Sequence, residues 1–162
     1  MKLNELMEKY GDYEVKEGFM DLLEKPKPKN VWDLKSGDRY FFLTASGIIQ
    51  GAFWHDDISD HNRLSIGNIS LTEEAAEFAR ERLEVIAELK KYAKEFSDEE
   101  WKNRDMMKYF FYRRFQDNRV YIACTYLVHY PCLYFESMEK AEQAFNAVGE
   151  ERIKKYYFGV KG

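Results

Sequence analysis

The chain has 162 residues, and its 25 Lys and Arg against 29 Asp and Glu give a formal net charge of −4 at pH 7. Twelve Phe, 12 Tyr and 3 Trp make it 17% aromatic, which excludes a disordered chain, and its 3 Pro and 9 Gly exclude collagen-like and low-complexity classes. The acidic balance excludes an overall basic nucleic-acid footprint, although residues 106–162 alone carry a small positive excess. The length predicts one domain or two small fused halves.

The N-terminal residues 1–25 are predicted to form a helical arm. Apolar residues recur at helical spacing over residues 3–10 and again over 17–24. Alternating Lys and Pro follow, and prolines two positions apart hold the backbone extended, so we place a linker at residues 26–30. The chain start lacks an apolar signal core, and no run approaches the ~18 apolar residues that span a membrane. The sequence therefore predicts a cytoplasmic protein without a membrane partner.

The first half, residues 31–96, is predicted as three strands followed by a helix. β-branched and aromatic residues indicate the strands, and the polar segment His55–Asn62 is expected to be the long tip of a hairpin. Thr72 is a good N-cap, and two apolar stripes at three-and-four spacing follow it. The expected elements are strands at 39–44, 48–54 and 63–70 and a helix at 72–96.

A polar connector over residues 97–107 leads to the second half, residues 108–162, which shows the same pattern. Ser137 is the predicted N-cap of its helix, and Gly149 ends that helix. The expected elements are strands at 108–114, 119–126 and 132–135, a helix from Ser137 to Gly149 and a last short helix at 150–156.

The two halves also match in sequence. Residues 39–42 (RYFF) resemble 108–111 (KYFF), and residues 72–77 (TEEAAE) resemble 137–142 (SMEKAE). The sequence thus predicts an α+β fold of two similar β-β-β-α halves, with small antiparallel sheets and covering helices, after the N-terminal arm. A chance match of two common patterns is the alternative.

The densest polar cluster predicts a partner-binding surface in the first half. Its expected members are Trp54, Asp56, Asp57, Asp60 and Arg63, with Trp54 as an exposed aromatic anchor beside acidic side chains. A solvated tip, whose aspartates bond to turn backbone, is the alternative. His55 and His61 add metal-ligand types, but the spacing matches no known loop motif, so we predict no metal and no cofactor.

A second candidate surface combines basic and aromatic residues in the second half. Arg113, Arg114, Arg119 and Tyr112 could bind a nucleic-acid strand by stacking and phosphate neutralisation. In a strand, alternate residues face opposite sides, so one aromatic face must be core and the other is either a platform or a second core layer.

No arrangement of nucleophile, base and orienting group is recognisable, and we predict no catalytic residues. His129 lies between Cys124 and Cys132, but without a family signature, so the two cysteines are expected to be buried reduced thiols.

Several strings resemble small accessory proteins of phages and prophages of Gram-positive bacteria. They are YGDYEV (residues 10–15), VWDLKSGDRY (31–40), the Trp, Asp, Asp, Arg and Gly-Asn pattern of residues 54–68, and GEERIKKYYFGV (149–160). The chain departs from that pattern at Ile69-Ser70 and over residues 123–132. The resemblance covers nearly the whole chain and implies a phage accessory gene without known catalytic residues.

These observations predict a non-enzymatic, phage-derived binding protein that inhibits a host factor in the bacterial cytoplasm. A defence nuclease such as a CRISPR effector is the expected kind of target, reached by occlusion or nucleic-acid mimicry. The alternative is a nucleic-acid-associated module; a metal-dependent hydrolase and a virion structural protein are weaker hypotheses. A homodimer is compatible with the wide apolar helix face. Unassigned aromatic residues, Phe115 and Trp101 among them, mark further places where a partner could bind.

Overall fold

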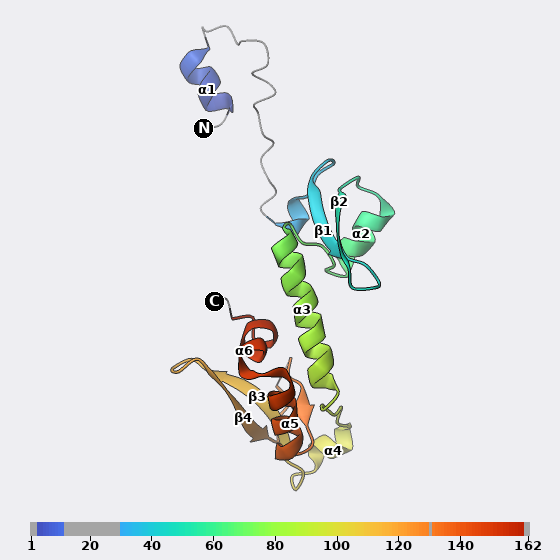
Figure 1. The fold of residues 1–162 in the computed structure, drawn as a ribbon, viewed down its shortest axis with the longest axis vertical. Coiled ribbons are helices and arrows are strands. Elements are labelled where there is room, and N and C mark those ends of the chain that lie inside the picture. The colour runs from blue at the N-terminus through green and yellow to red at the C-terminus, as the bar shows by residue number, and fades with distance from the viewer. Residues whose placement is uncertain (1–2, 12–29, 130, 161–162) are drawn as a thin grey trace.

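The computed structural model describes residues 3–11, 30–129 and 131–160 (Figure 1). The predicted helix over residues 17–24 and most of the predicted linker therefore lie outside the described residues. The helices and strands are α1 (Leu3–Tyr10), η2 (Val31–Asp33), β1 (Arg39–Leu43), β2 (Ile49–Phe53), α2 (Ile58–Ser65), α3 (Glu73–Lys90), α4 (Asp98–Lys102), β3 (Lys108–Arg114), β4 (Arg119–Thr125), β5 (Tyr134–Phe135), α5 (Met138–Val148), α6 (Glu150–Arg152) and η3 (Ile153–Tyr157). The predicted α+β class is confirmed, with one two-stranded and one three-stranded antiparallel sheet.

The first sheet is the β1–β2 hairpin. The predicted third strand over residues 63–70 is wrong, because helix α2 continues to Ser65 and the chain then pairs with β1 only at an isolated bridge between Phe41 and Ser70. Asn68 completes the return with its side chain, which accepts from the amide of Leu43 (2.8 Å) and donates to its carbonyl (2.7 Å). An amide side chain thus takes the place of a strand residue at the end of β1.

The second sheet has the order β4-β3-β5. Its β3–β4 hairpin runs from the pair Lys108–Thr125 to the pair Arg114–Arg119, and β5 lies antiparallel on the other side of β3. In both sheets, then, the segment before a capped helix pairs antiparallel with the first hairpin strand. The domain boundaries proposed from the sequence repeat stay a prediction.

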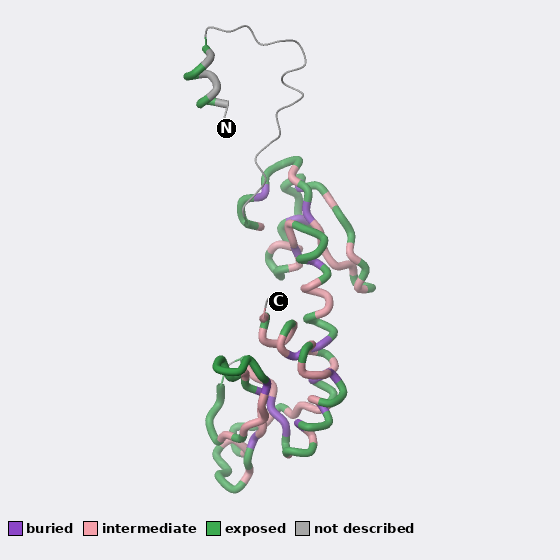
Figure 2. Tube along the Cα trace, turned by 60° about the vertical axis from the view of Figure 1, so that its left-hand side comes forward, coloured by how far each residue is buried: buried purple, intermediate pink, exposed green. Residues whose placement is uncertain are grey.

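Helix α3 connects the two sheets, as Figure 1 shows. It contacts β1 and β2 as well as α5 and η3. Val85 and Leu89 are fully buried in the core of the second sheet, together with Phe111, Phe135 and Ile153. A smaller core of Leu34, Tyr40, Trp54 and Ile69 supports the first sheet. Figure 2 shows buried residues in the region of each sheet and along α3.

The predicted end of this helix near Phe96 is wrong, since α3 ends at Lys90. Beyond it the amide of Lys94 donates to the carbonyl of Tyr134 (2.8 Å), so a contact with β5 takes the chain away from the helix axis.

The predicted connector contains helix α4, which sequence reasoning did not find. Ser97 and Glu100 form a capping box at its start. The side chain of Lys108 holds together α4 and the segment between α4 and β3. It is fully buried, and its ammonium donates to the carbonyls of Glu100 (2.5 Å), Asn103 (3.1 Å) and Met106 (2.7 Å). One lysine thereby bonds to a carbonyl in the last turn of the short helix and to two carbonyls of the segment that follows it.

Replacing Lys108 tests this role. We expect Lys108→Met to lower the free energy of unfolding by about 2–4 kcal/mol, because the thioether fills the space but leaves three partly buried carbonyls without the ammonium. Chemical denaturation measures the change, with Lys102→Met at an exposed site as the control. Equal stability of the two variants would contradict the role given to Lys108.

Candidate macromolecule-binding surface

The acidic surface predicted in the first half is not an exposed hairpin tip. Trp54 is only 4% exposed and belongs to the core of the first sheet, and Asp60 is only 2% exposed. The expected exposure of Trp54 as an aromatic anchor is therefore wrong, and both side chains offer a partner little surface. The polar residues start helix α2: Asp57 is the N-cap and forms a capping box with Asp60, which the sequence reading missed.

Asp60 belongs to a buried polar network. Its carboxylate accepts from the Tyr40 hydroxyl (2.6 Å) and from the amide of His55 (2.7 Å), and Arg63 donates to the same hydroxyl (2.6 Å). Burial opposes its ionisation, but the hydrogen bonds from Tyr40 and the backbone outweigh burial and hold its pKa below the ordinary value. Burial and the bond to Asp60 raise the pKa of Tyr40.

The other residues of the predicted acidic surface, Arg63, Asp56 and Asp57, lie around the buried Asp60 network. Arg63 packs its guanidinium 3.9 Å from the ring centre of Phe42, which makes it a structural residue of the first half. Asp56 and Asp57 are exposed, and Asp56 pairs with His61 at 3.0 Å. Among the described residues, no group of three or more His, Cys, Asp or Glu side chains is placed to hold a metal ion.

The residues of the second candidate surface do come together. Arg113, Arg114, Arg119 and Tyr112 all belong to the β3–β4 hairpin. We call residues 113–119 the hairpin tip; in Figure 1 it projects away from α3. Tyr112, Arg114 and Arg119 share one face of the sheet, here called the outer face, whereas Arg113 lies on the opposite, inner face. The helices pack on the inner face, where Phe111, Val120 and Phe135 are buried.

The outer face is covered at one end only. Near Lys108 it carries the α4 segment and the stretch Tyr126–His129, whose His129 ring stacks on Phe110 with ring centres 5.3 Å apart. Towards the hairpin tip, the contact that the described residues make with this face from outside the sheet is that of Glu150, which lies 3.9 Å from Arg119. The rings of Tyr112 and Tyr121 stack there at 5.7 Å, and Tyr112 is 38% exposed.

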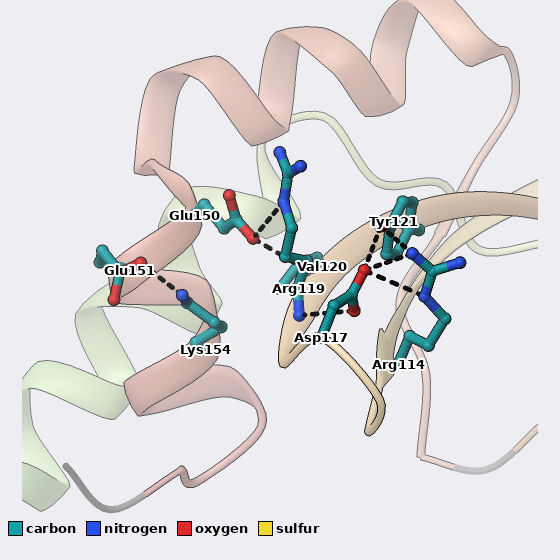
Figure 3. Close-up of polar contacts among 8 residues, drawn as sticks. All are labelled: Arg114, Asp117, Arg119, Val120, Tyr121, Glu150, Glu151 and Lys154. Atoms are coloured by element: carbon teal, nitrogen blue, oxygen red, sulfur yellow. Dashed lines mark hydrogen bonds and ion pairs between the residues drawn. The ribbon is translucent and has the colours of Figure 1, made fainter.

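Asp117 organises the hairpin tip, as Figure 3 shows. Its carboxylate accepts from the guanidinium of Arg114, from the Tyr121 hydroxyl and from the backbone amide of Arg119. These bonds, led by that of Arg114, hold the pKa of Asp117 far below its ordinary value. The same carboxylate raises the pKa of Arg114 and of Tyr121. A turn fixed by several convergent bonds keeps one shape before it meets a partner.

Phe115 projects from this ordered turn. Its side chain is 81% exposed, and the Arg113 guanidinium lies 4.4 Å from its ring centre on one side. Arg113 also donates to Asn118 (2.8 Å), whose φ of 56° turns the chain back towards β4. The Arg119 side chain is 65% exposed, and its guanidinium is as far as 3.9 Å from the Glu150 carboxylate. The ion pair between them is therefore weak. The hairpin tip thus presents one apolar ring flanked by guanidinium groups.

Other outcomes concern the cysteines and the remaining aromatic residues. Neither cysteine is in a disulfide. The expectation of two buried thiols is wrong, because Cys124 is exposed and Cys132 is only half-buried; partial burial raises the pKa of Cys132. Trp101 packs edge-on against Tyr134 with ring centres 4.8 Å apart.

Sequence reasoning missed the role of Asp117 and the exposed group Tyr126, Leu127 and Val128. The spacing of Arg114, Asp117 and Tyr121 across a turn was the available signal for Asp117.

In comparisons with protein-family models, with curated proteins and with solved structures, the chain matches none. No helix among the described residues is long and apolar enough to cross a membrane.

The role of Asp117 can be tested through the ionisation of Tyr121. Because the Asp117 carboxylate is the main cause of the raised pKa of Tyr121, Asp117→Asn should bring that pKa back towards 10. An NMR titration of ring-labelled tyrosine measures the shift, with Asp105→Asn, an exposed carboxylate outside the tip, as the control.

The pH dependence of the turn follows from the same interaction. The folded-state pKa of Asp117 is lowered, so its stabilisation of the turn is present above the unfolded-state value near 4 and is lost as the pH falls through the folded-state value. The signals of Arg114 and Tyr121 should therefore stay constant from pH 7 to about 4. A transition near neutral pH would contradict this account.

Proposed function

We propose that the protein is a non-enzymatic binding protein that acts by inserting the hairpin tip into a partner protein. The supporting observation is that Phe115 is highly exposed on a turn that Asp117 holds in one conformation. Aromatic and arginine side chains dominate binding hot spots, and a preorganised loop loses little conformational entropy on binding.

The charge of the hairpin tip describes the partner surface. Three arginines accompany one aspartate between residues 113 and 119, so the tip is positive although the whole chain is negative. A cleft with carboxylate groups and an apolar pocket for one ring would complement it. This reverses the charge expected from the acidic segment of the first half, where Trp54 and Asp60 are buried.

The resemblance to phage accessory proteins supports a biological setting for the proposal. The partner would be a host factor in the bacterial cytoplasm, such as a defence nuclease, and insertion of the hairpin tip would occlude its functional cleft. An inhibitor of this kind needs a rigid projecting element rather than catalytic groups.

A comparison of two phenylalanine variants tests the proposal. The tagged full-length chain is incubated with lysate of a Gram-positive host, and co-purifying proteins are quantified for wild type, Phe115→Ala and Phe53→Ala. Phe53 is 56% exposed in the first half and is the matched control. Phe115→Ala should reduce retention of the partner at least tenfold, since truncation of a hot-spot ring costs about 2 kcal/mol or more.

Two results would contradict the proposal. One is a partner retained equally by wild type and Phe115→Ala, and the other is a partner lost equally from both variants. Thermal unfolding of each variant shows whether the substitution affected folding, and Phe115 makes no contribution to either core, so a small change is expected.

The grouping of Arg113, Arg114, Arg119 and Tyr112 on one hairpin favours nucleic acid as a second candidate partner. However, the rings of Tyr112 and Tyr121 stack on each other, and Arg114 lies 4.4 Å from the ring centre of Tyr121, so their faces are largely occupied. Binding of a labelled 20-base single strand at low salt, steeply weakened by added salt and by Arg113→Gln with Arg119→Gln, would support this candidate. No binding at low salt would exclude it.

A further inference from the structure

Strand β4 is an edge of the second sheet, since it pairs with β3 on one side only. Backbone groups of alternate residues in such a strand point away from the sheet. The amide of Val120 donates to the carboxylate of Glu150 (3.0 Å), as Figure 3 shows, and this bond identifies the outward-pointing set as Val120, Ile122 and Cys124.

The outward amides of Ile122 and Cys124 have no hydrogen-bond partner in the described part of the chain. Edge strands usually carry charged residues, proline or a bulge that prevents pairing with another chain. β4 has the sequence RVYIACT, with its single charged residue at its first position, and it pairs with β3 without a bulge. Its free edge is therefore suited to strand addition.

We propose that this edge pairs with β4 of a second copy of the chain, antiparallel and centred on Ile122. In this register the two Ile122 residues exchange hydrogen bonds, and the amide of Cys124 donates to the carbonyl of Val120 in the second copy. A two-fold axis through the centre makes the contact closed and self-complementary. The two sheets become one continuous sheet.

The side chains support a second copy rather than an unrelated strand. Arg119 faces Thr125 of the second copy, so no like charges are opposed. Tyr121 faces Ala123 of the second copy, which pairs a large side chain with a small one. A strand from another protein does not need β4 to be complementary to itself. If the edge binds such a strand instead, the purified chain should be a monomer.

Glu150 limits this pairing. Its carboxylate accepts from the amide of Val120 at the position that the carbonyl of Cys124 from the second copy would take, so the Cys124–Val120 pair forms only when this carboxylate moves aside. Removing the carboxylate extends the available edge by one donor on each chain. Glu150 thus weakens an association that the rest of the edge favours.

The test combines association with hydrogen exchange on the full chain under reducing conditions. Sedimentation over a concentration series should show a monomer–dimer equilibrium, and the amides of Ile122 and Cys124 should exchange more slowly as the concentration rises. The amide of Val120, bonded to Glu150 in the monomer and to the second copy in the dimer, has a hydrogen-bond acceptor in both states, so it is the internal reference and should change little. A monomer at every concentration, or protection of Ile122 and Cys124 that does not follow concentration, would overturn the proposal.

Two substitutions at Cys124 sharpen the test. Cys124→Pro removes an outward amide that β3 does not use, and it should raise the dissociation constant at least tenfold. Cys124→Val keeps the amide and should dimerise like the wild type, which also excludes a disulfide as the cause. Glu150→Ala should lower the dissociation constant. Equal dimerisation of the proline and valine variants would overturn the proposal. The hydrogen-exchange experiment uses wild-type protein, so it tests the proposal even if the proline variant fails to fold.

Discussion

The uneven cover of the second sheet, whose inner face packs against helices and whose outer face is covered only near Lys108 among the described residues, is the constraint on which the rest of the structure depends. A three-stranded sheet whose third strand is Tyr134–Phe135 cannot bury both faces with the helices at hand, and α3, α5 and η3 all contribute to the same core. Since α3 also supports the hairpin of the first half, its apolar residues serve two sheets at once. Among the described residues, the outer face towards the hairpin tip is formed by aromatic and arginine side chains of the hairpin, with Glu150 beside Arg119.

Each half uses one aspartate, buried in the first half and exposed in the second, to order a segment outside the apolar core. In the first half, Asp60 joins Tyr40 and Arg63 and fixes α2 against β1. In the second half, Asp117 joins Arg114 and Tyr121 and fixes the hairpin tip. The first network is buried and holds the fold together, whereas the second lies at the surface beside Phe115. This difference in burial is why the hairpin tip, and not the acidic segment, is the surface that we assign to binding.

The strands and the capped helices could be predicted from the sequence because their signals are local. Alternating β-branched and aromatic residues mark β1 to β4, and Thr72 and Ser137 mark the starts of α3 and α5. Helix α2 was missed because Asp57 and Asp60 in a polar segment suggest a loop, and only the contact of Asp60 with Tyr40, twenty residues earlier, shows that the segment is packed.

The site was only partly predictable for the same reason. The basic and aromatic residues of the hairpin tip are visible in the sequence, and the pairing of β3 with β4 brings them together as alternation requires. The burial of Trp54 and of Lys108 depends on contacts between segments that no local pattern contains. For Lys108, the backbone carbonyls of the α4 segment supply those contacts.

Photo-crosslinking from the hairpin tip tests the central claim most directly. The full-length chain, expressed in host cells with a photoreactive phenylalanine analogue at position 115, should crosslink to one protein on irradiation, while the same analogue at position 53 should not. Crosslinking to that protein from position 53 but not from position 115, or no crosslink from either, would contradict the assignment of the hairpin tip as the binding surface.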